Sequence, residues 1–215
     1  MKLYGYYRSS AAFRIRIALN IKELELDHIF VHLRKGDQRS EQYLGVNPQG
    51  LVPALELDDG NIITQSMGII EYLDEAYPNT VSLLPDNMFG RARVRSISSA
   101  IACDIHPLNN LRVLNFISQN IDDGESIAND KWYKHWIQVG MNGVEALLNN
   151  SPDTGEFCHG NNPTMADCCL IPQIYNAERF GCDMTDYPKS MRINSNCLSL
   201  KAFRKAMPEE QADFE

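Results

Sequence analysis

The sequence predicts an α/β domain followed by an all-helical domain. Up to residue 80, short runs of aromatic and β-branched residues alternate with helical patterns, which is typical of an α/β domain. From residue 91 onward only helical periodicity remains, and the run Leu83-Leu84-Pro85-Asp86 is typical of a linker. We therefore expect domains at residues 1–80 and 86–215, each long enough to bury a core.

The first part of the chain predicts a strand, a helix and a second strand. Residues 2–6 have the short, aromatic, alternating pattern of a strand, and residues 27–31 have a similar pattern. Between them, the Arg8-Ser9-Ser10 run supplies turn and N-cap chemistry for a helix. One face of that helix carries Phe13, Ile17 and Ile21. This order implies a parallel strand pair with a right-handed crossover.

A hairpin and another helix complete the first domain. Residues 34–42 form a polar connection, and strands are expected at 52–57 and 62–64, joined by the turn at 58–61. Ser66 is the expected N-cap of the helix that follows. The order β-α-β, then β-β-α, is that of a thioredoxin-like domain.

The second domain is expected to be helical throughout. Pro107 interrupts its first periodic run, because a proline inside a helix removes a hydrogen bond. Thr164 and Asp167 have the spacing of a capping box, and Gly181 suits the position after a helix end. The expected helical segments are residues 91–120, 131–148, 164–181 and 187–207, followed by a polar tail at 208–215.

The net charge, the N-terminal pattern and the cysteine spacing exclude several classes of protein. A net charge of −8 argues against a general nucleic-acid binder, whose surface should be basic. The chain begins directly with a strand, without a leader pattern or an apolar run of membrane-spanning length, so we expect a cytoplasmic protein with no membrane partner. The six cysteines form no C-x-x-C pair and no zinc-like spacing with the five histidines. We expect reduced, buried thiols, as at Cys168-Cys169, and no metal site.

The turn at Ser9 and Ser10 is the first candidate site. A strand that enters a helix through a hydroxyl-rich turn aims backbone N–H groups and serine hydroxyls at one point, where the helix dipole is positive. Such a point suits an anion. No cysteine stands in this turn, so the expected anion is the thiolate of a bound thiol. The alternative is an ordinary capped helix that binds nothing.

The run Arg8-Ser9-Ser10, followed by Phe13-Arg14-Ile15-Arg16-Ile17-Ala18-Leu19, resembles the signature of zeta-class glutathione transferases, the maleylacetoacetate isomerases. The family pattern is Ser-Ser-Cys, an aromatic residue, then Arg-x-Arg-Ile-Ala-Leu. This chain departs from it at Ala11, so the serine hydroxyls must act without the family cysteine. The resemblance extends from Leu3 to Ala206 and implies the glutathione transferase fold, with glutathione as cofactor.

The resemblance also implies a set of glutathione contacts. In the family, the residue before a cis proline pairs with glutathione through its backbone, and here that residue is Val52. A Gln-Ser pair at a helix start holds the γ-glutamyl carboxylate, which implies Gln65 and Ser66. His106 has a second interpretation as a solvated or core-edge histidine beside Pro107. The implied glutathione contacts are Ser9, Ser10, Gln38, Val52, Gln65, Ser66, His106, Asn110 and Arg112.

The implied activity is the glutathione-dependent cis–trans isomerisation of maleylacetoacetate to fumarylacetoacetate, in tyrosine and phenylalanine catabolism. A thiolate adds to the activated alkene, the resulting single bond rotates, and the thiolate leaves. We assign thiolate stabilisation to Ser9 first and Ser10 second. Arg8 and Arg179 are expected to bind the carboxylates of a small keto-acid substrate, although Arg179 also suits a helix C-terminus.

Three alternatives share these residues. Isomerisation of maleylpyruvate would use the same site, as would broader glutathione conjugation. A non-catalytic interaction module with this fold is the third, and the loss of the cysteine at Ala11 points towards it. The intact set of Ser9, Val52-Pro53, Gln65-Ser66 and Arg179 argues against it. The resemblance further implies a homodimer.

Overall fold

The computed structural model describes residues 1–121 and 127–215, which form two compact units. The first unit contains residues 1–84 together with 198–215, and the second contains residues 85–197. The sequence groups residues 198–215 with the helical half, but they lie in the first unit because α9 (Lys201–Ala206) packs against α1 (Ser10–Ile21). None of the helices in the described ranges is both long and apolar enough to span a membrane.

The first unit contains a four-stranded sheet with the order β2-β1-β3-β4. Strand β1 (Lys2–Gly5) pairs in parallel with β2 (Asp27–Phe30) and antiparallel with β3 (Ala54–Glu56), which forms the expected hairpin with β4 (Ile62–Thr64). Leu3 is the register partner of both His28 and Leu55. The predicted thioredoxin-like topology is therefore confirmed.

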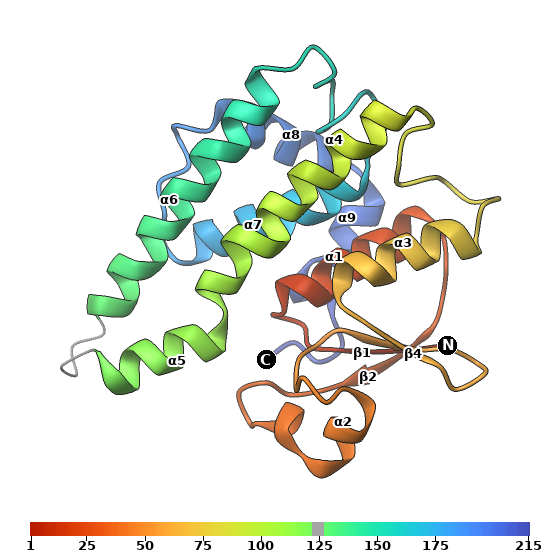
Figure 1. The fold of residues 1–215 in the computed structure, drawn as a ribbon, viewed down its shortest axis with the longest axis vertical. Helices are drawn as coiled ribbons and strands as arrows, with labels where there is room; N and C mark the ends of the chain where they lie inside the picture. Colours follow the sequence, from red (N-terminus) through yellow and green to blue (C-terminus); the bar gives the residue numbers. More distant parts are fainter. Residues whose placement is uncertain (122–126) are drawn as a thin grey trace. The chain divides into compact units, whose positions relative to one another are not determined.

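Helices cover both faces of this sheet (Figure 1). Helix α1 and helix α3 (Ser66–Ala76) lie on one face and contact each other, whereas α2 (Glu41–Val46) lies on the other face. The sequence missed α2 and the 3₁₀ turn η1 (Asp37–Arg39) before it. Ser40 caps α2 by accepting the Tyr43 N–H at 3.2 Å. A helix of six residues is too short to show a periodic pattern, so composition alone suggested a polar connection.

The second unit is helical, as predicted. Near Pro107 the expected helix of residues 91–120 is interrupted, as predicted, and divides into several helical segments. A π-helical turn and a 3₁₀ turn separate the two α-helical parts, because the proline lacks the N–H that would continue the ladder. The elements of this unit are α4 (Met88–Ser99), η2 (Ala100–Ile105), η3 (His106–Asn109), α5 (Leu111–Asn120), α6 (Ile127–Asn149), α7 (Met165–Arg179) and most of α8 (Pro188–Ser199).

Local signals fix both ends of α7. The capping box is present: Asp167 Oδ2 accepts the Thr164 N–H at 2.7 Å and the Thr164 hydroxyl at 2.9 Å. Asp167 Oδ1 also accepts the Cys158 N–H at 2.9 Å. Burial raises the pKa of the Asp167 carboxyl despite these hydrogen bonds. Gly181 follows the helix with a φ of 66°, a conformation that favours glycine.

Candidate active site

The turn between β1 and α1 has the geometry of an N-capped helix. Ser9 Oγ accepts the Ala12 N–H at 3.2 Å, and the Ser9 N–H donates to the Tyr6 carbonyl at 3.0 Å. Because Ser9 Oγ accepts the capping bond, its own hydroxyl proton can be donated to a further acceptor. Ser10 is the first residue of α1 and its side chain is buried. Ser9, which is half-buried, is therefore the more accessible of the two hydroxyls.

A buried arginine connects this turn to the start of α3. Arg14 is 2% exposed, and its Nη1 donates to Ser66 Oγ at 3.1 Å. The expected N-cap role of Ser66 is wrong, because α3 begins at Ser66 itself and Gln65 occupies the cap position. The sequence offered one signal for Arg14: it stands among apolar residues on the buried side of a helix. That signal does not distinguish a buried arginine from one that reaches the surface.

Gln65 has a left-handed backbone conformation, with a φ of 70°. This is uncommon for a residue other than glycine, and such residues cluster at functional sites. Its Nε2 donates to Gln49 Oε1 at 2.8 Å, so the Gln65 side chain is oriented by a loop residue. No sequence signal pointed to Gln49.

Val52 lies between the α2 region and the sheet. The Val52–Pro53 peptide bond is cis, as the resemblance implies. The Tyr43 hydroxyl and Asn47 Nδ2 donate to the Leu51 carbonyl at 2.6 Å and 2.7 Å. The strand ladder begins only at Ala54, so the main chain of Val52 lies outside it. Backbone groups that a sheet does not use can pair with an extended peptide.

Gln38 lies in η1 and contributes a buried acceptor near the same loop. Its Oε1 is buried and has no hydrogen-bond partner among the described residues. A Cβ added at Gly50, whose φ is 61°, would lie 3.0 Å from the Gln38 carbonyl oxygen, so the two loops approach closely. An unsatisfied buried acceptor is costly, and an N–H group of a bound ligand would satisfy it.

The second unit contains the segment with His106, Asn110 and Arg112. His106 is half-buried at the start of η3, and Asn110 caps α5 by accepting the Arg112 N–H at 3.1 Å through Oδ1. Because the cap uses only the oxygen, the Asn110 amide nitrogen keeps its donors. Trp132 Nε1 donates to the Leu108 carbonyl at 2.7 Å and so holds η3 against α6.

Arg179 is the last residue of α7 and is exposed. Its guanidinium carbon lies 4.6 Å from the centre of the Phe180 ring, and its Nη2 donates to Asn176 Oδ1 at 3.2 Å. The Phe180 ring stacks on Tyr133 with 3.9 Å between centroids. Burial raises the pKa of the Tyr133 hydroxyl, so the Tyr133 side chain that stacks on Phe180 stays uncharged. This position suits a partner of the helix dipole, and the carboxylate-binding role of Arg179 stays a prediction.

The turn is cationic although the chain as a whole is acidic. Arg8 is half-buried, with its guanidinium carbon 5.9 Å from the centre of the Tyr7 ring, and Arg14 lies behind the turn. Burial raises the pKa of Tyr6 to about 12, so its phenol is neutral at pH 7. The donors at this turn are hydroxyl, N–H and guanidinium groups.

The predicted residues fall into two sets, one in each unit. Within the first unit, the folding of the chain connects the serine turn to the start of α3 through Arg14. The first set consists of Arg8, Ser9, Ser10, Gln38, Val52, Gln65 and Ser66, and the second consists of His106, Asn110, Arg112 and Arg179.

Comparison with known proteins extends the resemblance to the whole chain. A family model described as glutathione S-transferase, N-terminal domain, matches residues 8–76. A probable maleylacetoacetate isomerase from Vibrio cholerae is 44% identical over 213 residues, which cover 98% of this chain and 97% of that protein.

Several solved structures match over their full length, and two of them serve as examples. One is the holo structure of a maleylpyruvate isomerase, described as a bacterial zeta-class glutathione S-transferase, with a TM-score of 0.95, 41% identity and 100% of both chains covered. The other is a maleylacetoacetate isomerase from Methylobacterium extorquens with bound malonate and glutathione, with a TM-score of 0.95, 39% identity and 100% of both chains covered. On this similarity over the full length, the chain belongs to the zeta-class glutathione transferases, the family that includes the maleylacetoacetate and maleylpyruvate isomerases.

Proposed function

We propose that this protein is a glutathione-dependent cis–trans isomerase that converts maleylacetoacetate to fumarylacetoacetate. The observation that carries the proposal is the capped turn at Ser9, which offers a hydroxyl donor at a helix N-terminus and is linked by Arg14 to Ser66. The relatives with this activity in their names support it, as does a solved maleylacetoacetate isomerase structure with bound malonate, a dicarboxylate, and glutathione. A cytoplasmic location belongs to the same proposal.

Bound glutathione would supply a thiolate that adds to the substrate alkene and leaves after rotation. The protein's part is to keep that sulfur ionised and to hold the carboxylates. Ser9 donates its hydroxyl proton to the sulfur while its oxygen keeps the cap of α1. The N-terminal N–H groups of α1 add a smaller contribution. Gln65 and Ser66 bind the γ-glutamyl carboxylate at the start of α3, and Val52 pairs with the peptide backbone.

Arg8 and Arg179 are the proposed ligands of the substrate carboxylates. Each offers a guanidinium beside an aromatic ring, which limits the conformations that the long side chain adopts. His106, Asn110 and Arg112 are proposed glutathione ligands from the second unit.

Maleylpyruvate is the second candidate substrate. The solved structure of a maleylpyruvate isomerase matches this chain as well as that of a maleylacetoacetate isomerase does, with a TM-score of 0.95 for both. The deciding experiment compares kcat/KM for the two substrates, with and without glutathione. The proposal expects turnover only with glutathione and a higher value for maleylacetoacetate. A higher value for maleylpyruvate would assign that substrate instead, and a protein that binds glutathione without turning over either would be an interaction module.

Arg8→Ala and Arg179→Ala should each lower kcat/KM for the dicarboxylate about tenfold, because each removes a charge-assisted hydrogen bond. Glutathione affinity, measured by calorimetry, should change less than twofold. The matched control is Arg91→Ala, which removes a half-buried arginine of α4 that is not among the proposed ligands. Unchanged kinetics in both Arg8→Ala and Arg179→Ala would remove the substrate assignment.

We also propose that the protein is a homodimer. Met88 and Phe89 stand at the start of α4 with 87% and 74% of their surfaces exposed. Large apolar side chains exposed next to each other are typical of an interaction surface. Sedimentation equilibrium should give twice the chain mass of 24.4 kDa, and Phe89→Ser should shift the equilibrium towards the monomer. A wild-type protein that sediments as a monomer at micromolar concentration would contradict this.

A further inference from the structure

The C-terminal segment, residues 211–215, lies against the turn that precedes Arg8. Asp213 Oδ2 accepts the Tyr7 N–H at 2.9 Å, and the Tyr7 hydroxyl donates to the Glu215 carbonyl at 3.4 Å. The Phe214 ring packs edge-on against the Tyr7 ring with 5.4 Å between centroids. Tyr7 is only 3% exposed, so these contacts are part of its burial.

The end of this segment is held by a loop of the same unit. Glu215 Oε2 lies 3.0 Å from His32 Nε2, and Glu215 Oε1 lies 3.6 Å from Lys35 Nζ. His32 Nδ1 accepts the Lys35 N–H at 3.1 Å, so Nε2 carries the ring proton and donates it to Glu215. The hydrogen bond from His32 lowers the pKa of the Glu215 carboxyl. Because Glu215 is exposed, this contact contributes little stability. The Asp213 contact with buried Tyr7 is the stronger restraint.

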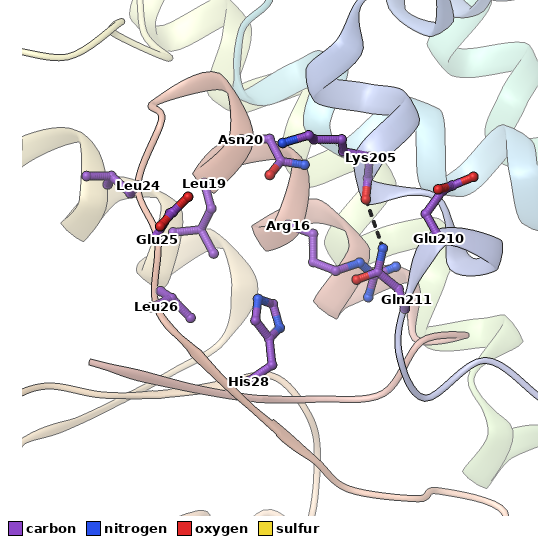
Figure 2. A pocket seen from close by; sticks show the side chains of 10 residues that line it. All are labelled: Arg16, Leu19, Asn20, Leu24, Glu25, Leu26, His28, Lys205, Glu210 and Gln211. Atoms are coloured by element: carbon purple, nitrogen blue, oxygen red, sulfur yellow. Dashed lines mark hydrogen bonds between the residues drawn. The ribbon is translucent and has the colours of Figure 1, made fainter.

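Arg16 holds the opposite side of Tyr7. Its Nη2 donates to the Tyr7 carbonyl at 3.0 Å, and its Nε donates to the Ala206 carbonyl at 3.0 Å. Arg16, Gln211 and His28 all line one cavity, whose volume is about 470 Å³. Figure 2 labels these lining residues. Both main-chain polar groups of Tyr7 are therefore held: the N–H by Asp213 and the carbonyl by Arg16.

Tyr7 transmits this restraint to Arg8. The two residues share a peptide bond, and the Arg8 guanidinium lies over the ring whose edge contact is Phe214. The Ser9 N–H, donating to the Tyr6 carbonyl, closes the same turn. We propose that Asp213 is a positioning residue, which acts through Tyr7 to hold the Arg8 guanidinium where the substrate carboxylate binds. This inference rests on the substrate-binding role proposed for Arg8.

The test is a double-mutant cycle of Asp213→Ala and Arg8→Ala, measured as kcat/KM for the dicarboxylate with glutathione saturating. Asp213→Ala alone should raise KM about fivefold and change kcat less than twofold, the size of one lost backbone hydrogen bond. In the Arg8→Ala background, Asp213→Ala should have almost no further effect on kcat/KM, because the guanidinium that Asp213 positions is absent. If the double variant instead showed the product of the two single-variant decreases in kcat/KM, the proposal would be overturned. Asp213 would then act independently of Arg8.

Two further variants separate positioning from general destabilisation. Asp213→Asn keeps a carbonyl acceptor for the Tyr7 N–H, so its KM should be close to that of the wild type. Glu210→Gln removes one negative charge from the neighbouring segment without touching Tyr7 and should leave KM unchanged. The proposal would be overturned if Asp213→Ala had the wild-type KM, or if Glu210→Gln raised KM as much as Asp213→Ala does. A wild-type protein that turns over no dicarboxylate would instead reject the proposed function, so the two failures are distinguishable.

Discussion

Ser9→Ala should raise the pKa of the thiol of bound glutathione by roughly one to two units and lower kcat/KM at pH 7 by roughly 10- to 100-fold. A free thiol has a pKa of about 8.5, and lowering it by two units requires about 2.7 kcal/mol. A hydrogen bond to the charged form supplies about 1.5–3 kcal/mol, and the helix end about 0.3–1 kcal/mol. We therefore expect the Ser9 hydroxyl to supply more of this roughly 2.7 kcal/mol than the helix end does. An ultraviolet titration of the bound thiolate measures the shift directly.

The control for this experiment is Ser40→Ala. Ser9 caps α1 and Ser40 caps α2 in the same unit, each accepting an N–H at 3.2 Å. Both substitutions should cost about 1 kcal/mol of unfolding free energy. Only Ser9→Ala should move the thiolate titration, and Ser9→Thr should restore it. If the titration of Ser9→Ala matches that of the wild type, the role passes to Ser10 or to the backbone N–H groups.

Gly140→Ala should destabilise the protein by about 3 kcal/mol, the upper range for overpacking a core. A Cβ at Gly140 would lie 2.3 Å from Ile105 Cγ1 and 2.6 Å from Ile105 Cδ1. Ile105 is 2% exposed at the end of the π-helical turn, so it cannot move aside without moving the segment that begins at His106. We therefore expect weaker glutathione binding as well. Urea unfolding and calorimetry measure the two effects.

Gly143→Ala is the matched control, three residues further along α6. No heavy atom lies within 4 Å of the Cβ that it would add, and it should stabilise the helix by up to about 1 kcal/mol. Ile105→Ala removes the two atoms that clash and should cost about 2–5 kcal/mol alone. Adding Gly140→Ala to it should cost less than in the wild type. If the two losses of unfolding free energy simply added, contact with the Ile105 side chain would not be the cause of the Gly140→Ala effect.

The strands and helix ends were largely predictable because their signals are local. The Ser9 cap, the capping box of Thr164 and Asp167, and the glycine after α7 each involve residues within a few positions of one another. Short elements such as α2 escaped detection, since six residues cannot show a helical period. The role of Ser66 was misjudged for a similar reason: a serine before an apolar stripe suits both the cap position and the first helical turn, and only the backbone of Gln65 distinguishes them.

The sequence was enough to propose the candidate site residues, but it did not identify the residues that orient them. Nothing in the composition of the loop that contains Gln49 indicates that it orients Gln65. The polar tail gave no sign that Asp213 binds Tyr7, because an aspartate in a polar segment is equally compatible with solvent. These supporting residues are recognisable only by what they touch.

By itself, the sequence determined the order of the strands and of the longer helical segments, the hydroxyl-bearing turn and the family, because each depends on residues close together in the chain. The tertiary structure alone decided which distant residues restrain that turn. Arg14 reaches Ser66 across 52 positions, and Asp213 reaches Tyr7 across 206. The physical reason is that a hydrogen bond depends on distance in space, whereas a sequence pattern records only distance along the chain.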